Sequence, residues 1–166
     1  MNKMMFVIAL IAYSLFGTES FAQQSIWPGS QCQRWSTAYP EPTMNWSAIY
    51  NGTGLTMAVD CPVERNDFSG FLHWPGIESA WVSVIDQNFS ADARCWQGYL
   101  SVGSNGVWSA YSTASAYSSG TNGGAQRLYL PSMSLPNDEV HTFIGCTIPP
   151  TYSGYVSYLV NYYVNQ

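Results

Sequence analysis

The segment Val140–Ile148 (VHTFIGCTI) has an apolar or small residue at every even-numbered position. Successive side chains of a β-strand point to opposite faces, so the even-numbered row, which includes Cys146, would share one face. His141 falls in the other row, and we expect it to face solvent. The segment therefore predicts a strand with one face buried in a core.

Seven further segments carry the same period of two. The apolar residues of Leu55–Cys61 are odd-numbered, and Val and Tyr alternate at the even positions of Val156–Val164. The remaining candidates are Ser47–Tyr50, Ala80–Asp86, Ala91–Leu100, Gly106–Ser112 and Gln126–Leu130. Segments rich in Gly and Pro separate them, and no window shows the stripe of an amphipathic helix. We predict an all-β fold: an antiparallel β-sandwich of about eight strands, jelly-roll or immunoglobulin-like.

The composition narrows the class of protein. Of 166 residues, 46% are apolar and 9% are charged, with five basic and ten acidic side chains and a net charge of −5. The apolar content supports one buried core, and so few basic residues exclude a phosphate-binding surface for nucleic acid. An acidic chain also disfavours docking on anionic membranes. Lys3 is the only lysine, so the chain after it has no lysine that could serve as a general base or form a Schiff base.

The first 22 residues are typical of a secretory signal peptide. Lys3 supplies the charged start, Phe6–Phe16 (FVIALIAYSLF) the apolar stretch, and Ser20-Phe21-Ala22 the small residues before a cleavage site. A helix of that apolar stretch, at about 1.5 Å per residue, is too short to cross a hydrocarbon core of about 30 Å. We predict a signal peptide over 1–22 and a single β-sandwich domain over 23–166, secreted or periplasmic.

Four cysteines fall in the predicted mature chain: Cys32, Cys61, Cys95 and Cys146. An even number in an exported chain favours two disulfides, which would stabilise the fold by restricting the unfolded chain. No two cysteines are close in sequence, and neither His73 nor His141 completes a ligand pair, so we expect no zinc site and no other metal. Four cysteines allow three pairings, and the sequence leaves all three open.

Several landmarks of the mature chain carry a resemblance. Ala48–Asn51 (AIYN) leads to Ala58–Val63 (AVDCPV), a strand with Cys95 follows, and Phe143–Pro150 (FIGCTIPP) precedes a closing strand of alternating Tyr and Val. With these landmarks, which span most of Cys32–Gln166, the chain resembles a set of small secreted bacterial proteins of unassigned function. The resemblance implies an exported β domain with disulfides, and it implies no catalytic residue.

Tryptophan is the most unusual feature, because all seven tryptophans follow the predicted signal peptide. An exposed indole ring stacks on the apolar face of a sugar while neighbouring polar groups bind its hydroxyls. The competing use of these rings is to fill the core. Trp96 is out of phase with Cys95, and Trp81 is out of phase with Val82, so at least one of each pair should point outward. The candidate ligand-binding residues are Trp74, Trp81, Trp96 and Trp108.

Signals for catalysis are weak. His73 has no nucleophile motif such as G-x-S-x-G nearby, and we expect no catalytic residue and no cofactor. A glycosidase pair would need two carboxyl groups at a suitable separation. The acids available for such a pair are Asp60, Glu64, Asp67, Glu78, Asp86 and Asp92. Oxygen-rich loops such as residues 86–88 suit side-chain-capped turns as well as calcium.

These observations predict a secreted, non-catalytic binding module that recognises a glycan or a cell-surface partner through exposed aromatic residues. The alternative is a structural subunit of an extracellular coat or filament, which would self-associate through a last strand expected at a sheet edge. An acidic-residue glycoside hydrolase is the third hypothesis. Asn45, Asn51 and Asn88 also fit the N-glycosylation pattern, whose use depends on the host.

Overall fold

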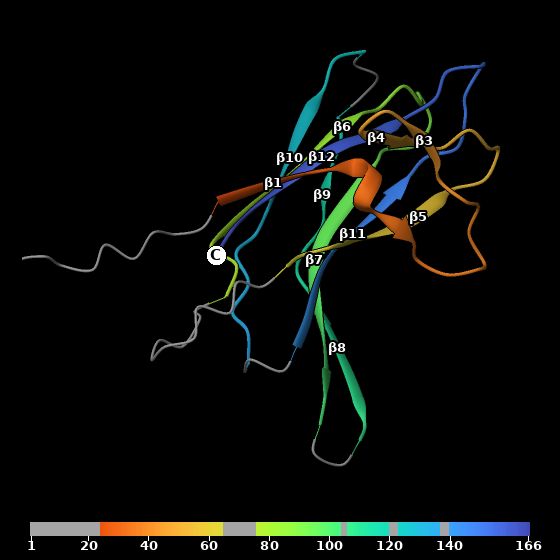
Figure 1. The fold of residues 1–166 in the computed structure, drawn as a ribbon. Helices are drawn as coiled ribbons and strands as arrows, with labels where there is room; N and C mark the ends of the chain where they lie inside the picture. The colour runs from red at the N-terminus through yellow and green to blue at the C-terminus, as the bar shows by residue number, and fades with distance from the viewer. Residues whose placement is uncertain (1–23, 65–75, 104–105, 120–122, 137–139) are drawn as a thin grey trace, which may run out of the picture.

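The computed structural model describes residues 24–64, 76–103, 106–119, 123–136 and 140–166. These residues form two antiparallel β-sheets that pack against each other around an apolar core (Figure 1). The predicted all-β sandwich is therefore confirmed. The alternating polar and apolar residues explain it, because each sheet has one apolar face that only a second layer can bury.

The first sheet, sheet A, has the strand order β10-β6-β12-β4-β3, and β1 pairs with β12 beyond the end of β4. Its strands are β1 (Gln24–Pro28), β3 (Thr43–Asn45), β4 (Ala48–Tyr50), β6 (Ser79–Ile85), β10 (Gln126–Leu130) and β12 (Tyr158–Asn165).

The second sheet, sheet B, has the strand order β2-β5-β11-β7-β8, and β9 also pairs with β7. Its strands are β2 (Gln33–Arg34), β5 (Met57–Pro62), β7 (Arg94–Val102), β8 (Trp108–Ser112), β9 (Ala116–Tyr117) and β11 (Val140–Ile148). A short 3-10 helix, η1 (Gly29–Gln31), connects β1 to β2 and so joins the two sheets. In Figure 1 the end of β7 and all of β8 project beyond the body of the sandwich.

The bounds of β10 and β11 match the predicted strands, and the even-numbered row of β11 is buried while His141 is exposed. The sequence prediction misses β1, β2, β3 and β9, which are short or contain proline. The expected edge position of the last strand is wrong, because β12 pairs with β6 on one side and with β4 and β1 on the other. Alternation reports which face of a strand is buried, but it does not report the neighbours of that strand.

The predicted alternation along the last strand is also wrong at one point. The pairing of β12 with β6 shifts register between Leu159 and Asn161. This irregularity moves the buried row from odd to even numbers, so that Leu159, Tyr162 and Val164 are all fully buried. A bulge of this kind inserts one residue and exchanges the two faces beyond it.

Both disulfides lie within sheet B. Cys32 bonds to Cys61, which links the start of β2 to β5, and Cys95 bonds to Cys146, its direct partner in the ladder between β7 and β11. All four cysteines are buried in the core between the sheets. The expected two disulfides are thus present, and neither joins the two sheets as the conserved disulfide of immunoglobulin domains does.

A buried carboxylate connects the two sheets at one end of the sandwich. Asp86, just after β6, is 0% exposed. Its Oδ1 accepts from the Asn88 N–H and the Ser157 hydroxyl, both at 3.0 Å, and its Oδ2 accepts from the Ala93 N–H at 3.0 Å and from the Ser118 hydroxyl. Ser157 leads into β12 of sheet A, whereas Ala93 and Ser118 flank strands of sheet B.

Two of the three N-glycosylation motifs fall in this buried region. Asn51 is 0% exposed, and its Nδ2 donates to the carbonyl groups of Leu55, Ile148 and Pro149 at 2.7, 3.1 and 3.0 Å. The Nδ2 of Asn88 donates to a carbonyl in the same way and is equally enclosed. Neither nitrogen is accessible in the folded protein.

The signal peptide predicted over 1–22 lies outside the described residues. Within the described part of the chain, no helix is long and apolar enough to span a membrane.

Replacing the buried carboxylate should destabilise the protein strongly. Asp86→Ala removes the acceptor shared by four buried donors, two of which have no other acceptor among the described residues, so we expect the free energy of unfolding to fall by about 3 kcal/mol or more in urea denaturation. Asp92→Ala, an exposed carboxylate in the same loop, is the control and should change it by less than about 0.5 kcal/mol. Equal effects of the two substitutions would contradict a structural role for Asp86.

Peptide mapping without reductant should recover the pairs Cys32–Cys61 and Cys95–Cys146. Removing one bridge by a Cys-to-Ala double substitution should lower the free energy of unfolding by about 2–4 kcal/mol, because the unfolded chain regains conformational freedom. Recovery of a peptide that links Cys61 to Cys95 would show that the pairing is different.

Candidate functional site

The structure does not gather the four candidate tryptophans into one site. Trp74 lies outside the described residues. Trp81 lies on the outer face of sheet A, since its neighbours Ala80 and Val82 are buried in the core. Trp96 and Trp108 lie on the outer face of sheet B: Trp108 pairs with Val102, six residues along β7 from Trp96, or about 20 Å at strand spacing.

The indole ring of Trp96 lies over a glycine. Gly145 of β11 is the direct partner of Trp96 in the ladder, and a Cβ added to Gly145 would come within 2.6 Å of the Trp96 ring carbons. A side chain at position 145 would therefore push the ring away from the sheet. Glycine allows the indole to lie against the backbone of the neighbouring strand.

Two further rings complete an aromatic cluster, which we define as Trp35, Trp96 and Phe143. The Trp35 ring centroid lies 6.0 Å from that of Trp96, with the planes at 58°, and 5.2 Å from that of Phe143 in an edge-to-face contact. Phe143 is only 3% exposed and forms the floor of the cluster, whereas Trp35 is 42% exposed. Trp35 therefore presents an exposed ring at an angle to the Trp96 ring.

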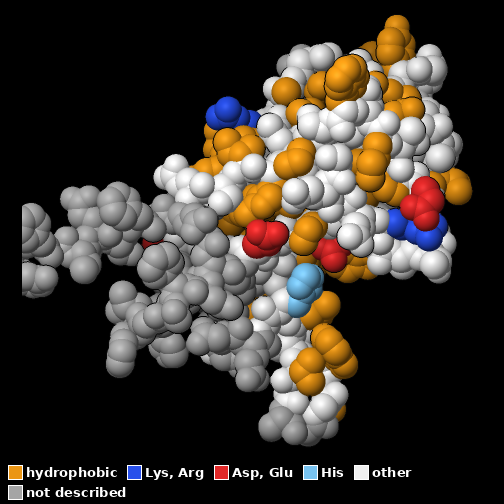
Figure 2. Space-filling view, in the orientation of Figure 1, with side chains coloured by type: hydrophobic (Ala, Val, Ile, Leu, Met, Phe, Trp, Pro, Cys, Tyr) orange, Lys and Arg blue, Asp and Glu red, His pale blue; other side chains and the backbone are white. Residues whose placement is uncertain are grey.

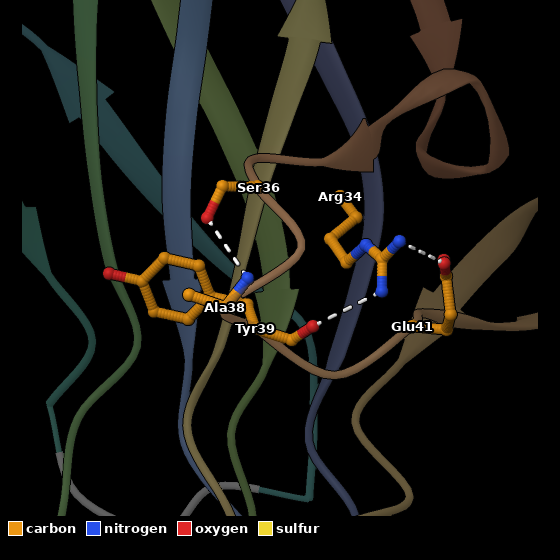
Figure 3. A network of polar contacts seen from close by, with 5 residues as sticks. All are labelled: Arg34, Ser36, Ala38, Tyr39 and Glu41. Carbon is orange, nitrogen blue, oxygen red and sulfur yellow. Dashed lines mark hydrogen bonds and ion pairs between the residues drawn. The ribbon is translucent and has the colours of Figure 1, made fainter.

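The loop that carries Trp35 is held by a small polar network (Figure 3). The guanidinium of Arg34 forms an ion pair with Glu41 at 2.7 Å and donates to the Tyr39 carbonyl at 3.5 Å. The Ser36 hydroxyl accepts from the Ala38 N–H at 3.3 Å. The contacts of Arg34 with Tyr39 and Glu41 thus connect the two ends of the loop that contains Trp35.

Charged groups border the aromatic cluster. The Arg94 guanidinium carbon lies 5.2 Å from the Trp96 ring centroid and 5.9 Å from that of Tyr117, and its Nε donates to the Ser115 hydroxyl at 2.8 Å. Stacked contacts of this kind hold the guanidinium in place while leaving other N–H groups free to donate.

An acid lies on the same face. Asp60 of β5 is the ladder partner of Gly145, and its Oδ1 is buried without a hydrogen-bond partner. Burial raises the pKa of the Asp60 carboxyl above its usual value, and the charge of the nearby His141 partly offsets this rise. The Oδ1 atom is closed to solvent, whereas Asp60 as a whole is only partly buried beside Gly145.

Together these groups suit a ligand that has both an apolar face and hydroxyl groups. The Trp96 ring offers an apolar surface, Trp35 offers a second at an angle to it, Arg94 can donate, and the partly buried Asp60 lies beside them. This combination of ring surface with a few fixed polar groups is the chemistry of sugar recognition.

The outer face of sheet A carries a second group of rings. Trp81 stacks on Tyr163, with centroids 5.4 Å apart and planes at 10°, and the Arg127 guanidinium carbon lies 4.6 Å from its centroid. An arginine thus lies over Trp81 as Arg94 does over Trp96, and the two rings differ in their aromatic neighbours: Tyr163 is stacked on Trp81, whereas Trp35 is tilted against Trp96. At the loop end of the sandwich, a shallow hollow of about 200 Å³ is lined by Gln87, Phe89, Gly123 and Tyr155, and its lining carries no charge.

Two of the acids considered above are engaged in hydrogen bonds. Asp86 is buried and fully hydrogen-bonded, and Glu78 accepts from the Asn165 amide at 3.2 Å. Asp67 and His73 lie outside the described residues. In the described ranges, no group of three or more His, Cys, Asp or Glu side chains could hold a metal ion.

Of the residues around this cluster, the sequence analysis named Trp96 as a candidate and did not name Trp35, Phe143 or Gly145. A usable signal was present for Phe143 and Gly145, since both are odd-numbered in β11 and therefore out of phase with the buried row that contains Cys146. Trp35 follows a two-residue strand, and nothing in its local sequence indicates which face it covers.

Comparison with models of protein families and with curated proteins finds no match. Among solved structures, the chain is similar to a family two carbohydrate esterase from Cellvibrio japonicus, with 9% identity and a TM-score of 0.44 over 87% of this chain; it spans only 34% of that esterase chain.

Two smaller solved structures are similar over nearly their whole length. They are the CBM36-1 domain of a multidomain xylanase from the hindgut metagenome of Trinervitermes trinervoides (9% identity, TM-score 0.45, 87% of this chain and 97% of that one) and the low affinity xylan binding module CBM86 from Roseburia intestinalis (11% identity, TM-score 0.46, 87% and 96%).

The raised pKa of Asp60 predicts a pH-dependent gain from Asp60→Asn. In the unfolded chain the Asp60 carboxyl ionises near its ordinary pKa of 3.8, whereas in the folded chain its pKa is higher. The free energy of unfolding of the wild type therefore falls as the pH rises through the folded pKa. The free energy of unfolding of Asp60→Asn relative to wild type should therefore increase from below pH 3.8 towards neutrality. The control is Asp92→Asn at an exposed position, whose free energy of unfolding should change with pH as that of the wild type does. The same parallel behaviour from Asp60→Asn would contradict a raised pKa of Asp60.

Proposed function

We propose that this chain is an exported, non-catalytic module that binds a glycan on the outer face of sheet B. The observation that carries the proposal is the Trp96 ring, which lies over Gly145 beside the exposed Trp35 and the Arg94 guanidinium. Ring surface and hydrogen-bonding groups thus converge on one area of a rigid sheet.

The charge of the chain favours a neutral glycan. A net charge of −5 repels acidic polysaccharides at long range; of the two cations beside the cluster, Arg34 is ion-paired with Glu41, which leaves Arg94. The continuation of the same sheet face towards Trp108 gives a linear glycan further surface along β7.

Export is supported by the two disulfides, which are typical of proteins that fold in an oxidising compartment. We infer that residues 1–22 are removed as a signal peptide and that residues 23–166 form a single domain, secreted or periplasmic. In this proposal the module has no active site and acts by attachment to its glycan or to a cell surface that displays it.

Glycan binding should depend on Trp96. In calorimetric titration with a panel of neutral polysaccharides, xylan and cellulose among them, we expect Trp96→Ala to weaken binding about tenfold or more, because truncating a central aromatic residue removes its stacking surface. Gly145→Ala should weaken binding as well, since the added methyl group displaces the Trp96 ring without removing any aromatic group.

The matched control is Trp46→Ala. Trp46 is 97% exposed in the turn between β3 and β4 of sheet A, so this substitution removes an exposed indole on the other sheet. It should leave the affinity unchanged, and thermal unfolding should show that all three variants are folded. Failure of the wild-type protein to bind any glycan, or equal loss from Trp46→Ala, would refute the proposal.

A further inference from the structure

Strand β8 lies at an open edge of sheet B. It ends the strand order of that sheet, and within the described residues it pairs with β7 alone. All five residues of β8 are exposed, whereas the five-residue strands β1 and β10 each have residues that are partly or fully buried. Figure 2 shows hydrophobic side chains along this projecting arm. The most exposed of them in the arm are Val107 at 59%, Trp108 at 67% and Tyr111 at 51%.

The other sheet edges carry features that normally prevent pairing with another chain. The β10 edge carries Arg127, β1 ends at Pro28, β2 and β9 have two residues each, and β3 has three. Charged residues, proline and short length all block the addition of a strand. The sequence of β8, WSAYS, has no charge, no glycine and no proline, and it contains two aromatic residues that favour strands.

The uncharged arm suits a second copy of the chain, which presents the same uncharged strand. No charged residue lies between Arg94 and Arg127, so the whole β7–β8 arm beyond Arg94 is neutral although the chain carries −5. When two copies meet through this arm, no charged side chains of the arm face each other at the contact. A charged partner would find no complementary group on β8.

We propose that β8 is a dimerisation edge, at which two copies of the chain pair β8 with β8 in antiparallel orientation, centred on Ala110. The small Ala110 side chains then face each other at the two-fold axis, and each Trp108 lies opposite Ser112 of the other copy. Large residues are thus opposite small ones, and the same surface serves both copies, as a closed two-fold interface requires.

The pairing has a consequence for the proposed glycan site, although the pairing itself does not depend on that site. The two-fold axis stands perpendicular to the joined sheet, so the outer faces of both copies lie on the same side. Two clusters built around Trp96 would then face one polysaccharide, and the second contact would be made at a high effective concentration.

The test uses the full mature chain in light scattering over a wide range of concentrations, with paired charge substitutions at the axis. Wild type should show a twofold rise in mass with concentration. Ala110→Lys and Ala110→Asp should each remain monomeric, because like charges about 5 Å apart across the axis repel. An equimolar mixture of the two variants should restore the dimer, since the charges are now opposite; this recovery also shows that both variants are folded.

Tyr129→Lys, which places a charge on the exposed β10 edge of sheet A, is the matched control and should leave dimerisation unchanged. A wild-type protein that stays monomeric at all concentrations would overturn the proposal. So would dimers that persist in both Ala110 variants, or a mixture that remains monomeric. None of these readouts involves a glycan, so failure here is distinct from failure of glycan binding.

Discussion

The Asp86 carboxylate is the interaction on which the arrangement of the two sheets most depends. It is fully buried, no cation contacts it in the described part of the chain, and it accepts from four donors. A buried charge is tolerable only when its hydrogen bonds are all made, so the segments that supply these donors have to come together. Those segments lead into strands of both sheets. The same end of the sandwich is held by Asn51, whose amide connects the end of β4 to the end of β11.

Sheet B is stabilised in a different way, and this suits a binding surface. Two cross-strand disulfides lie on its inner side, while the outer side carries the Trp35, Trp96 and Phe143 rings. Side chains on paired strands have little freedom to rearrange, so a ligand would lose little affinity to the ordering of its site. The same aromatic residue types serve the core elsewhere: Trp27 stacks on the buried Tyr162 at 5.4 Å. Neighbours, not residue type, decide which rings stay available.

The candidate site was predictable in part. The alternation of side chains along a strand placed Trp96 on the face opposite Cys95. The same alternation places Phe143 and Gly145 on the face opposite Cys146. This alternation could not show that Tyr163 and Arg127 contact the ring of Trp81, because these contacts join three strands that are distant in sequence. It also could not show that Asp60 and Trp96 flank the same glycine, which depends on the order β5-β11-β7.

The sequence by itself determined the all-β class, the bounds of β10 and β11 and the buried row of β11, because the period of two is a local property that each strand carries alone. The pairing of the four cysteines, the central position of β12, the register shift after Leu159 and the partners of Trp35 were decided by the tertiary structure. Each of these depends on which distant segments lie side by side, and many arrangements of strands satisfy the same local alternation. Only the simultaneous packing of both apolar faces, with every buried donor of the Asp86 network bound, selects one of them.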